Sequence, residues 1–134
     1  MFGMEVQIED RFDRVLAAEE TARYRNFGHA AASIRKSAQA SIVDAPGPSA
    51  PGTPPHTRRR GKRPSQIRRA IVYSADKFGA IVGPRASVLG TAGGAHEFGG
   101  SFRGSKYPQR PFMFPALFRN QRRFGQSWAG SIHN

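Results

Sequence analysis

The sequence contains no cysteine, and this absence removes several chemistries at once. Without thiols the chain has no disulfide scaffold, no thiolate zinc site and no cysteine nucleophile. Long apolar runs are missing too, because no stretch reaches the roughly 18 residues that a bilayer-spanning helix needs. The first ten residues are acidic and lack a basic segment followed by an apolar run. We therefore expect no signal peptide, no membrane contact and synthesis in the cytoplasm.

Acidic residues are also scarce, and this argues against an enzyme. Beyond residue 20 the acids are Asp44, Asp76 and Glu97, so a pair of carboxylates for general acid–base catalysis is not expected. The sequence has no GxSxG nucleophile elbow, no GxxxxGK[ST] phosphate loop and no HExxH zinc motif. We predict a protein without catalytic residues, metal or cofactor.

Positive charge is the most prominent feature of the chain. Its 134 residues include 21 Lys and Arg against 9 Asp and Glu, a net charge of +12. Residues 1–20 hold six acids and two arginines, a net charge of −4, and the remainder carries +16. A field of this size favours an anionic partner, either nucleic acid or the acidic face of another protein chain.

Residues 8–43 are predicted to form one long helix. Apolar or small residues recur at helical spacing along it, at Phe12, Val15, Leu16, Phe27, Ala30, Ala31, Ile34, Ala38 and Ile42. Gly28 marks a position where this helix is weakened and can bend. A helix of about 35 residues is about 50 Å long, more than one small core covers. We therefore expect part of the apolar stripe to pack on a neighbouring subunit.

Residues 44–66 change to an extended arm rich in proline and arginine. Five prolines stiffen it and are candidate interface residues, namely Pro46, Pro48, Pro51, Pro54 and Pro55. Seven bases follow within twelve residues: Arg58, Arg59, Arg60, Lys62, Arg63, Arg68 and Arg69. Three interpretations stay open for these bases, namely sequence-independent binding of DNA, docking on an acidic protein neighbour, and a solvated loop.

Residues 67–115 are predicted to form a small antiparallel sheet with loops. Ile67 to Tyr73 and Ala80 to Val82 suit two strands of a hairpin, joined by a turn at Asp76–Gly79. Glycine-rich loops over 84–104 and an extended piece over 105–115 follow.

A final helix is predicted over 116–130, with Pro115 in its first turn. Its expected buried face comprises Leu117, Phe118, Gln121, Phe124 and Trp128. The late cluster of phenylalanines favours core packing, with a subunit interface as the alternative. The chain as a whole, residues 1–134, is predicted to be one α+β domain.

His96 and Glu97 are the one adjacent pair that suggests catalysis or metal binding. The other histidines, His29, His56 and His133, lie far apart in the sequence and give no ligand spacing. We therefore favour structural hydrogen bonds for this pair, with Phe98 anchoring the turn in the core.

Three segments, in this order, resemble the neck or tail-completion proteins of long-tailed bacteriophages. The first runs from Ala50 to Ile71 and joins the proline-glycine arm, the basic turn and an Arg-Arg-Ala-Ile strand entry. The second is Ile81–Pro84 leading to Ala95-His96-Glu97-Phe98-Gly99-Gly100. The third is Tyr107–Leu117, which is similar to a Pro-x-Arg-Pro-Phe-x-x-Pro-Ala signature before a terminal helix.

The resemblance covers about residues 30–130 and implies structural roles for a set of motif residues. These are His96, Glu97, Phe98, Gly99, Pro108, Arg110, Pro111, Phe112 and Pro115. The chain departs from the family at Arg60–Arg63, where relatives often have Thr-Gly-x-Leu, and its final helix carries Arg and Phe in place of acids.

The resemblance implies a long helix over a small antiparallel sheet, closed by a C-terminal helix. It also implies a structural virion protein that is assembled in the host cytoplasm and forms a ring at the head–tail junction. Its partners would be other copies of itself, a portal-side adaptor or head-completion protein, the tail terminator and the DNA in the channel. The alternative is a small basic protein that binds nucleic acid without sequence preference.

Overall fold

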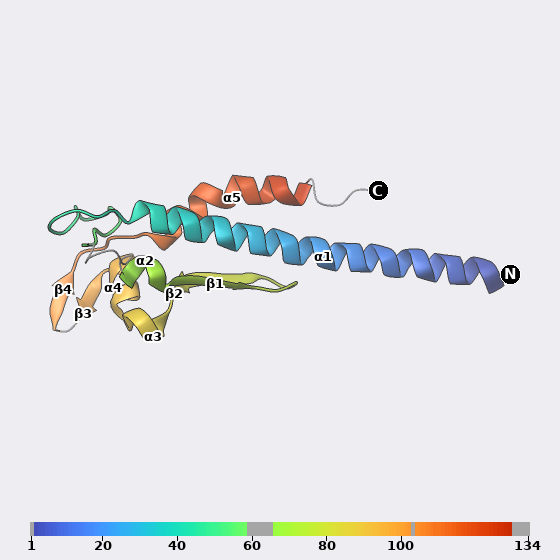
Figure 1. The fold of residues 1–134 in the computed structure, drawn as a ribbon, viewed down its shortest axis with the longest axis horizontal. Coiled ribbons are helices and arrows are strands. Elements are labelled where there is room, and N and C mark those ends of the chain that lie inside the picture. Colours follow the sequence, from blue (N-terminus) through green and yellow to red (C-terminus); the bar gives the residue numbers. More distant parts are fainter. Residues whose placement is uncertain (1, 59–65, 103, 130–134) are drawn as a thin grey trace.

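The computed structural model describes residues 2–58, 66–102 and 104–129 and has the α+β arrangement that the sequence predicts. In chain order its elements are α1 (Phe2–Ser41), α2 (Gln66–Ala70), β1 (Ile71–Ala75), β2 (Ala80–Pro84), α3 (Ala86–Leu89), α4 (Ala92–Phe98), β3 (Gly100–Phe102), β4 (Ser105–Tyr107) and α5 (Met113–Ala129). Helix α1 runs the length of the molecule, with α5 along one side and the hairpins and short helices along the other (Figure 1).

Helix α1 is longer than predicted and runs without interruption through Gly28. Its C-terminal half carries the apolar stripe that the sequence indicates. Ala31, Ile34 and Ala38 are buried on one face of the helix, and Ile42, the first residue after α1, is buried too and continues the 3-4-4 spacing.

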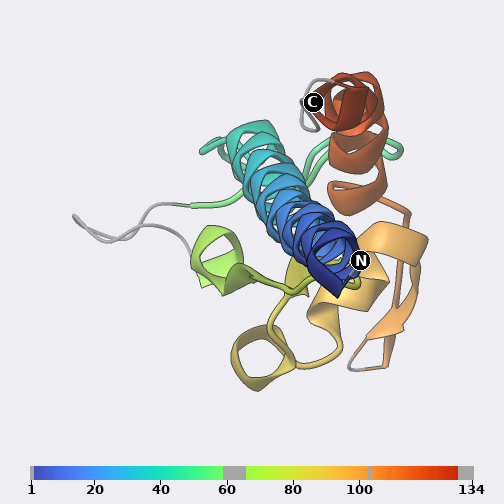
Figure 2. The ribbon, with the colours of Figure 1, turned by 90° about the vertical axis from the view of Figure 1, so that its right-hand side faces the viewer.

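The core forms where this stripe meets β1 and the start of α5. Ile34, Ala38 and Ile42 pack with Ile71 and Phe112, and Ala116 completes the cluster. Phe112 is completely buried and is the largest side chain in this core. Seen end-on, α1 lies between α5 and the β-hairpins, so it contributes to the core from the centre of the molecule (Figure 2).

The N-terminal half of α1 projects beyond both α5 and the β1–β2 hairpin (Figure 1). Every described side chain from Arg11 to Ala18 is exposed, including Val15 at 64% and Leu16 at 43%. At the hairpin, Lys77 Nζ lies 3.0 Å from Glu20 Oε1. Apolar side chains therefore occur past the part of the helix that this chain covers.

Two separate two-stranded hairpins occur among the described residues. Strands β1 and β2 pair antiparallel from Ile71↔Pro84 to Ala75↔Ala80. The Asp76–Gly79 turn between them is confirmed, since Asp76 Oδ1 accepts the backbone N–H groups of Phe78 and Gly79 at 2.7 and 3.0 Å. Strands β3 and β4 form the second hairpin.

The prediction that the first strand begins at Ile67 is wrong, because residues 66–70 form the short helix α2. Ala70 and Ile71 lie three and four residues after Ile67. This spacing suits one helical turn rather than the alternation of a strand. Ala70 is buried and Ile67 packs against the core, so the turn is stabilised by tertiary contact. Residues 86–98, expected as loops, likewise contain the short helices α3 and α4.

Helix α5 begins at Met113, and Pro115 lies in its first turn as predicted. The predicted buried face is partly wrong. Leu117, Phe118 and Gln121 are exposed, whereas Phe124 and Trp128 are half-buried. Because α5 packs on α1 along one side, its other apolar side chains stay partly exposed, from Leu117 at 37% to Phe118 at 62%.

Candidate functional site

Glu97 joins the two motifs that carry most of the resemblance. Its carboxylate accepts three backbone N–H groups at the start of α5, from Phe112 and Met113 at 2.9 Å each and from Phe114 at 2.8 Å. These N–H groups have no partner inside the helix, and the positive end of the helix dipole favours a carboxylate there. Glu97 is buried and acts as a helix cap supplied by α4.

His96 and Arg110 hold the same junction from the backbone side. The Arg110 N–H donates to the His96 carbonyl at 2.6 Å, and Arg110 Nε donates to the Ser49 carbonyl at 2.9 Å. Burial lowers the pKa of His96, and the nearby Arg110 guanidinium lowers it further. The interpretation of His96 and Glu97 as structural residues therefore fits the geometry.

Gly99 has a left-handed backbone conformation and lies close to the backbone of Gln109, and both features favour glycine at this position. Its φ is +71°, and a Cβ there would lie 3.1 Å from the Gln109 nitrogen. The prediction that Phe98 anchors this turn in the core is wrong, since Phe98 is 67% exposed. Its ring instead meets Phe114 edge-on at 5.9 Å, on the surface of the molecule.

The proline arm folds back on itself over its described length. Thr57 N donates to Val43 O at 2.9 Å, and Ala45 N donates to Thr57 O at 3.1 Å, so the chain returns to the end of α1. Gly52 N donates to Gln109 O at 2.7 Å, which fixes the tip of the loop to the third motif. Pro55 is buried and Pro54 is half-buried, whereas the other arm prolines, Pro46, Pro48 and Pro51, are exposed.

The basic candidates divide into different environments. Arg59, Arg60, Lys62 and Arg63 lie outside the described residues. Arg58 and Arg69 are exposed.

Arg68, in contrast, is engaged within the protein. Its Nε donates to Ile42 O at 2.7 Å, a second guanidinium nitrogen binds the same carbonyl, and the third lies 3.5 Å from Asp44 Oδ2. A cation at the C-terminal end of α1 complements the helix dipole. Arg68 therefore stabilises the fold and is a poor candidate for contact with DNA.

An open apolar groove of about 540 Å³ lies between α1, the β1–β2 hairpin and α5. Its walls are Phe27, Ala30, Ala31 and Ile34 of α1, Gly79 to Val82 of the hairpin, and Leu117, Asn120, Gln121 and Phe124 of α5. Ile81 is 79% exposed although it is a large aliphatic side chain in this groove. Sequence patterning identified most of these residues as apolar positions, but no sequence signal separated those facing an open groove from those in a closed core.

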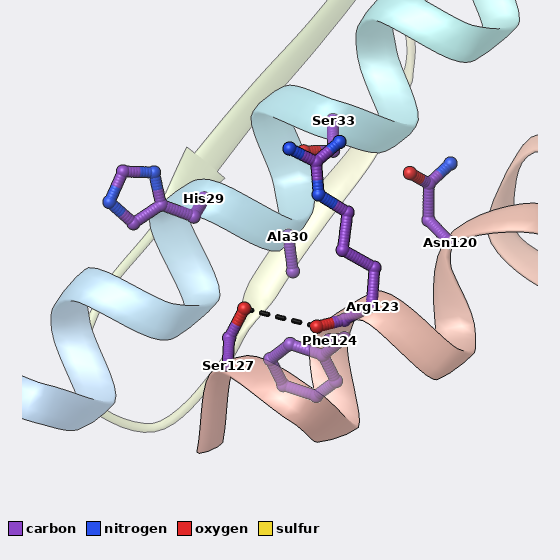
Figure 3. A pocket seen from close by; sticks show the side chains of 7 residues that line it. All are labelled: His29, Ala30, Ser33, Asn120, Arg123, Phe124 and Ser127. Carbon is purple, nitrogen blue, oxygen red and sulfur yellow. Dashed lines mark hydrogen bonds between the residues drawn. The ribbon is translucent and has the colours of Figure 1, made fainter. Parts of the chain in front are cut away.

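A smaller, more polar pocket adjoins the groove and shares Ala30, Asn120 and Phe124 with it. His29 and Ser33 of α1 and Arg123 and Ser127 of α5 complete its lining (Figure 3). Asn120 Nδ2 also donates to Ser37 Oγ at 2.9 Å, which ties α5 to α1 beside the pocket. The groove thus has an apolar floor and a polar, partly cationic edge.

Among the residues that the structure describes, no group of three or more His, Asp or Glu side chains is arranged to hold a metal ion. No described helix combines the length and apolarity that crossing a membrane requires. Comparisons of the chain with protein-family models, with curated proteins and with solved structures found no match.

Proposed function

We propose that this chain is a structural subunit of a ring in the neck or tail-completion region of a long-tailed phage. It would join the portal side of the capsid to the tail and surround the DNA channel. In this proposal the chain has no catalytic role, and its partners are copies of itself and the neighbouring neck proteins.

The observation that carries the proposal is the convergence of the three segments that resemble that family. The arm loop meets the third segment through Arg110–Ser49 and Gly52–Gln109, and the second segment meets the third through Glu97 and His96. Residues that recur together in a family signature are expected to serve one structural unit. Here they form one hydrogen-bonded junction beneath α5.

The long helix and the uneven charge give physical support. A subunit that leaves an apolar helix face and an apolar groove uncovered suits an assembly in which neighbours cover them. A ring closes by head-to-tail contacts, so the donating and the receiving surfaces must differ. The acidic N-terminal segment and the basic remainder offer such a difference.

Electron microscopy of particles from the phage or prophage that encodes the chain tests the proposal directly. We expect the chain in a ring at the head–tail junction, with basic side chains toward the channel. Absence of the chain from the particle would overturn the proposal. A ring whose lumen carries Asp and Glu, with Arg58–Arg63 on the outside, would overturn only the contact with DNA.

The charge of +12 favours one alternative, a small basic protein that binds nucleic acid without sequence preference. Such a protein would be monomeric and would lose nucleic acid steeply as salt rises. It would also be recovered on nucleic acid in the cell rather than in particles. The alternative accounts for the charge but gives no reason for the junction around Glu97.

A further inference from the structure

We infer that the apolar groove between α1, the β1–β2 hairpin and α5 receives the projecting N-terminal half of α1 from a second copy of this chain. The inference deepens the proposed ring and rests on it, since it names the contact that joins neighbouring subunits. Both halves of the contact lie on the same polypeptide.

The donating surface is the part of α1 that extends past the body (Figure 1). Val15 and Leu16 are both apolar and exposed there, at 64% and 43%. The sequence places apolar residues at 8, 12, 15 and 16, which is the i, i+4, i+7, i+8 spacing of a helix that lies in a groove. A large exposed stripe of this kind on a helix is typical of an interaction surface.

The receiving surface matches a helix in chemistry. The groove is lined by Phe27, Ala30, Ile34, Ile81, Leu117 and Phe124 among others, and it is open to solvent. Ala30 and Ala31 keep the floor low, which allows a second helix to approach α1 closely.

Charge selects this occupant over an arbitrary apolar helix. Residues 1–20 carry a net charge of −4. Helix α5, which forms one wall of the groove, contains Arg119, Arg122 and Arg123 and no acid, and all three arginines are exposed. An acidic amphipathic helix placed in the groove would meet Arg123, which lines the adjoining pocket, at the rim, and residues 21–134 around it carry a net charge of +16. Complementary charge favours this pairing over like-charged alternatives.

The contact is heterologous, because the helix of one copy enters the groove of the next. Each copy keeps one free helix and one free groove, so the contact propagates and closes as a ring when the rotation allows. Helix α1 cannot fill its own groove, since its N-terminal half points away from the body as a continuous helix (Figure 1).

Two full-length double variants test the contact by complementation. Val15→Lys/Leu16→Lys disables the helix and leaves the groove intact, whereas Ile81→Asp/Leu117→Asp disables the groove and leaves the helix intact. All four side chains are at least partly exposed, so we expect unchanged circular dichroism and thermal midpoints. Val43→Asp, at an exposed apolar position outside both surfaces, is the matched control.

Mass is measured by light scattering and analytical ultracentrifugation over increasing concentration. We expect the wild type and Val43→Asp to form species larger than one chain, each double variant alone to stay monomeric, and an equimolar mixture of the two to form a dimer and nothing larger. A wild type that stays monomeric up to its solubility limit overturns the inference. So do double variants that still assemble, or a mixture that stays monomeric.

The outcome separates the inference from the proposed function. If the complementation succeeds but the chain is absent from phage particles, the groove contact stands and the neck function fails. If the chain forms a ring in particles whose neighbours meet elsewhere, the function stands and the groove contact fails. If the groove instead captures an acidic helix of another neck protein, the wild type alone is monomeric and the inference is overturned.

Discussion

At the scale of single residues, a buried acid in a strongly basic chain determines where the last helix begins. Glu97 binds three N–H groups of α5 from a position 15 to 17 residues earlier in the sequence. A sequence-local cap would lie directly before the helix, where this chain has Pro111 and Phe112. The adjacent pair His96-Glu97 suggested chemistry, and the described contacts of the Glu97 carboxylate are those of a helix cap.

Replacing the buried Glu97 carboxylate should lower the free energy of unfolding more than replacing an exposed carboxylate. We expect Glu97→Gln to lower the free energy of unfolding by about 1–3 kcal/mol, because charged hydrogen bonds to buried N–H groups are lost. Glu20→Gln, which removes an exposed ion pair with Lys77, should cost less than about 1 kcal/mol. Urea denaturation at neutral pH measures both, and equal small losses would contradict the capping role.

Protonation of His96 should make the free energy of unfolding depend on pH, and the sign follows from the lowered pKa of this side chain. Its folded pKa is lowered from 6.5 by burial and by Arg110, so the unfolded chain binds the proton more readily. Stability is therefore at its full value above about pH 6.5 and falls as the pH drops from there through the folded pKa. We expect His96→Gln to flatten this part of the profile in denaturation series between pH 7.5 and about pH 5. An unchanged slope in the variant would show that His96 is not the group responsible.

At the scale of elements, helical spacing predicted the buried side of α1 because three consecutive stripe positions, Ile34, Ala38 and Ile42, face one core. The same spacing misassigned α5, where Leu117 and Phe118 are apolar but exposed. Periodicity reveals which residues share a face, and it cannot reveal whether the rest of the molecule is wide enough to cover that face. The turn at Asp76 was predictable because its hydrogen bonds are local, whereas the junction around Glu97 and Arg110 depends on contacts between distant segments.

Two glycines in different elements should respond to alanine with opposite signs. Gly28 lies inside α1, and a Cβ there meets nothing within 4 Å. We expect Gly28→Ala to raise the free energy of unfolding by about 0.5–1 kcal/mol, because alanine loses less conformational entropy in a helix. Gly99→Ala should be destabilising, because φ is +71° and the Cβ would press on the backbone of Gln109. Thermal melts of the two variants decide the matter, and a stabilised Gly99→Ala would refute the close approach at the junction.

At the scale of the whole molecule, charge and apolar surface are separated along the chain. The acidic end of α1 projects, while the basic body carries the open groove. A compact monomer gains nothing from this separation, since it leaves like charges together and apolar surface in water. The proposed assembly would use both features, because the acidic helix of one copy would cover the apolar groove of the next.

The basic run, Arg58 to Arg69, can be tested for contact with DNA. Of its seven cations, Arg68 is held by Ile42 O, which leaves Arg58, Arg59, Arg60, Lys62, Arg63 and Arg69 as candidates for phosphate contact. If these six bind DNA, the logarithm of the association constant falls linearly with the logarithm of salt, and changing all six to Gln reduces that slope by about 5, at about 0.9 per phosphate contact. Binding of a labelled duplex at several salt concentrations measures the slope. Arg119→Gln/Arg122→Gln/Arg123→Gln is the control, because these exposed cations lie on α5, outside the basic run. A slope that is unchanged by the six substitutions would assign the basic run to a protein partner or to solvent. In the proposed ring, the channel DNA would then have to meet another surface.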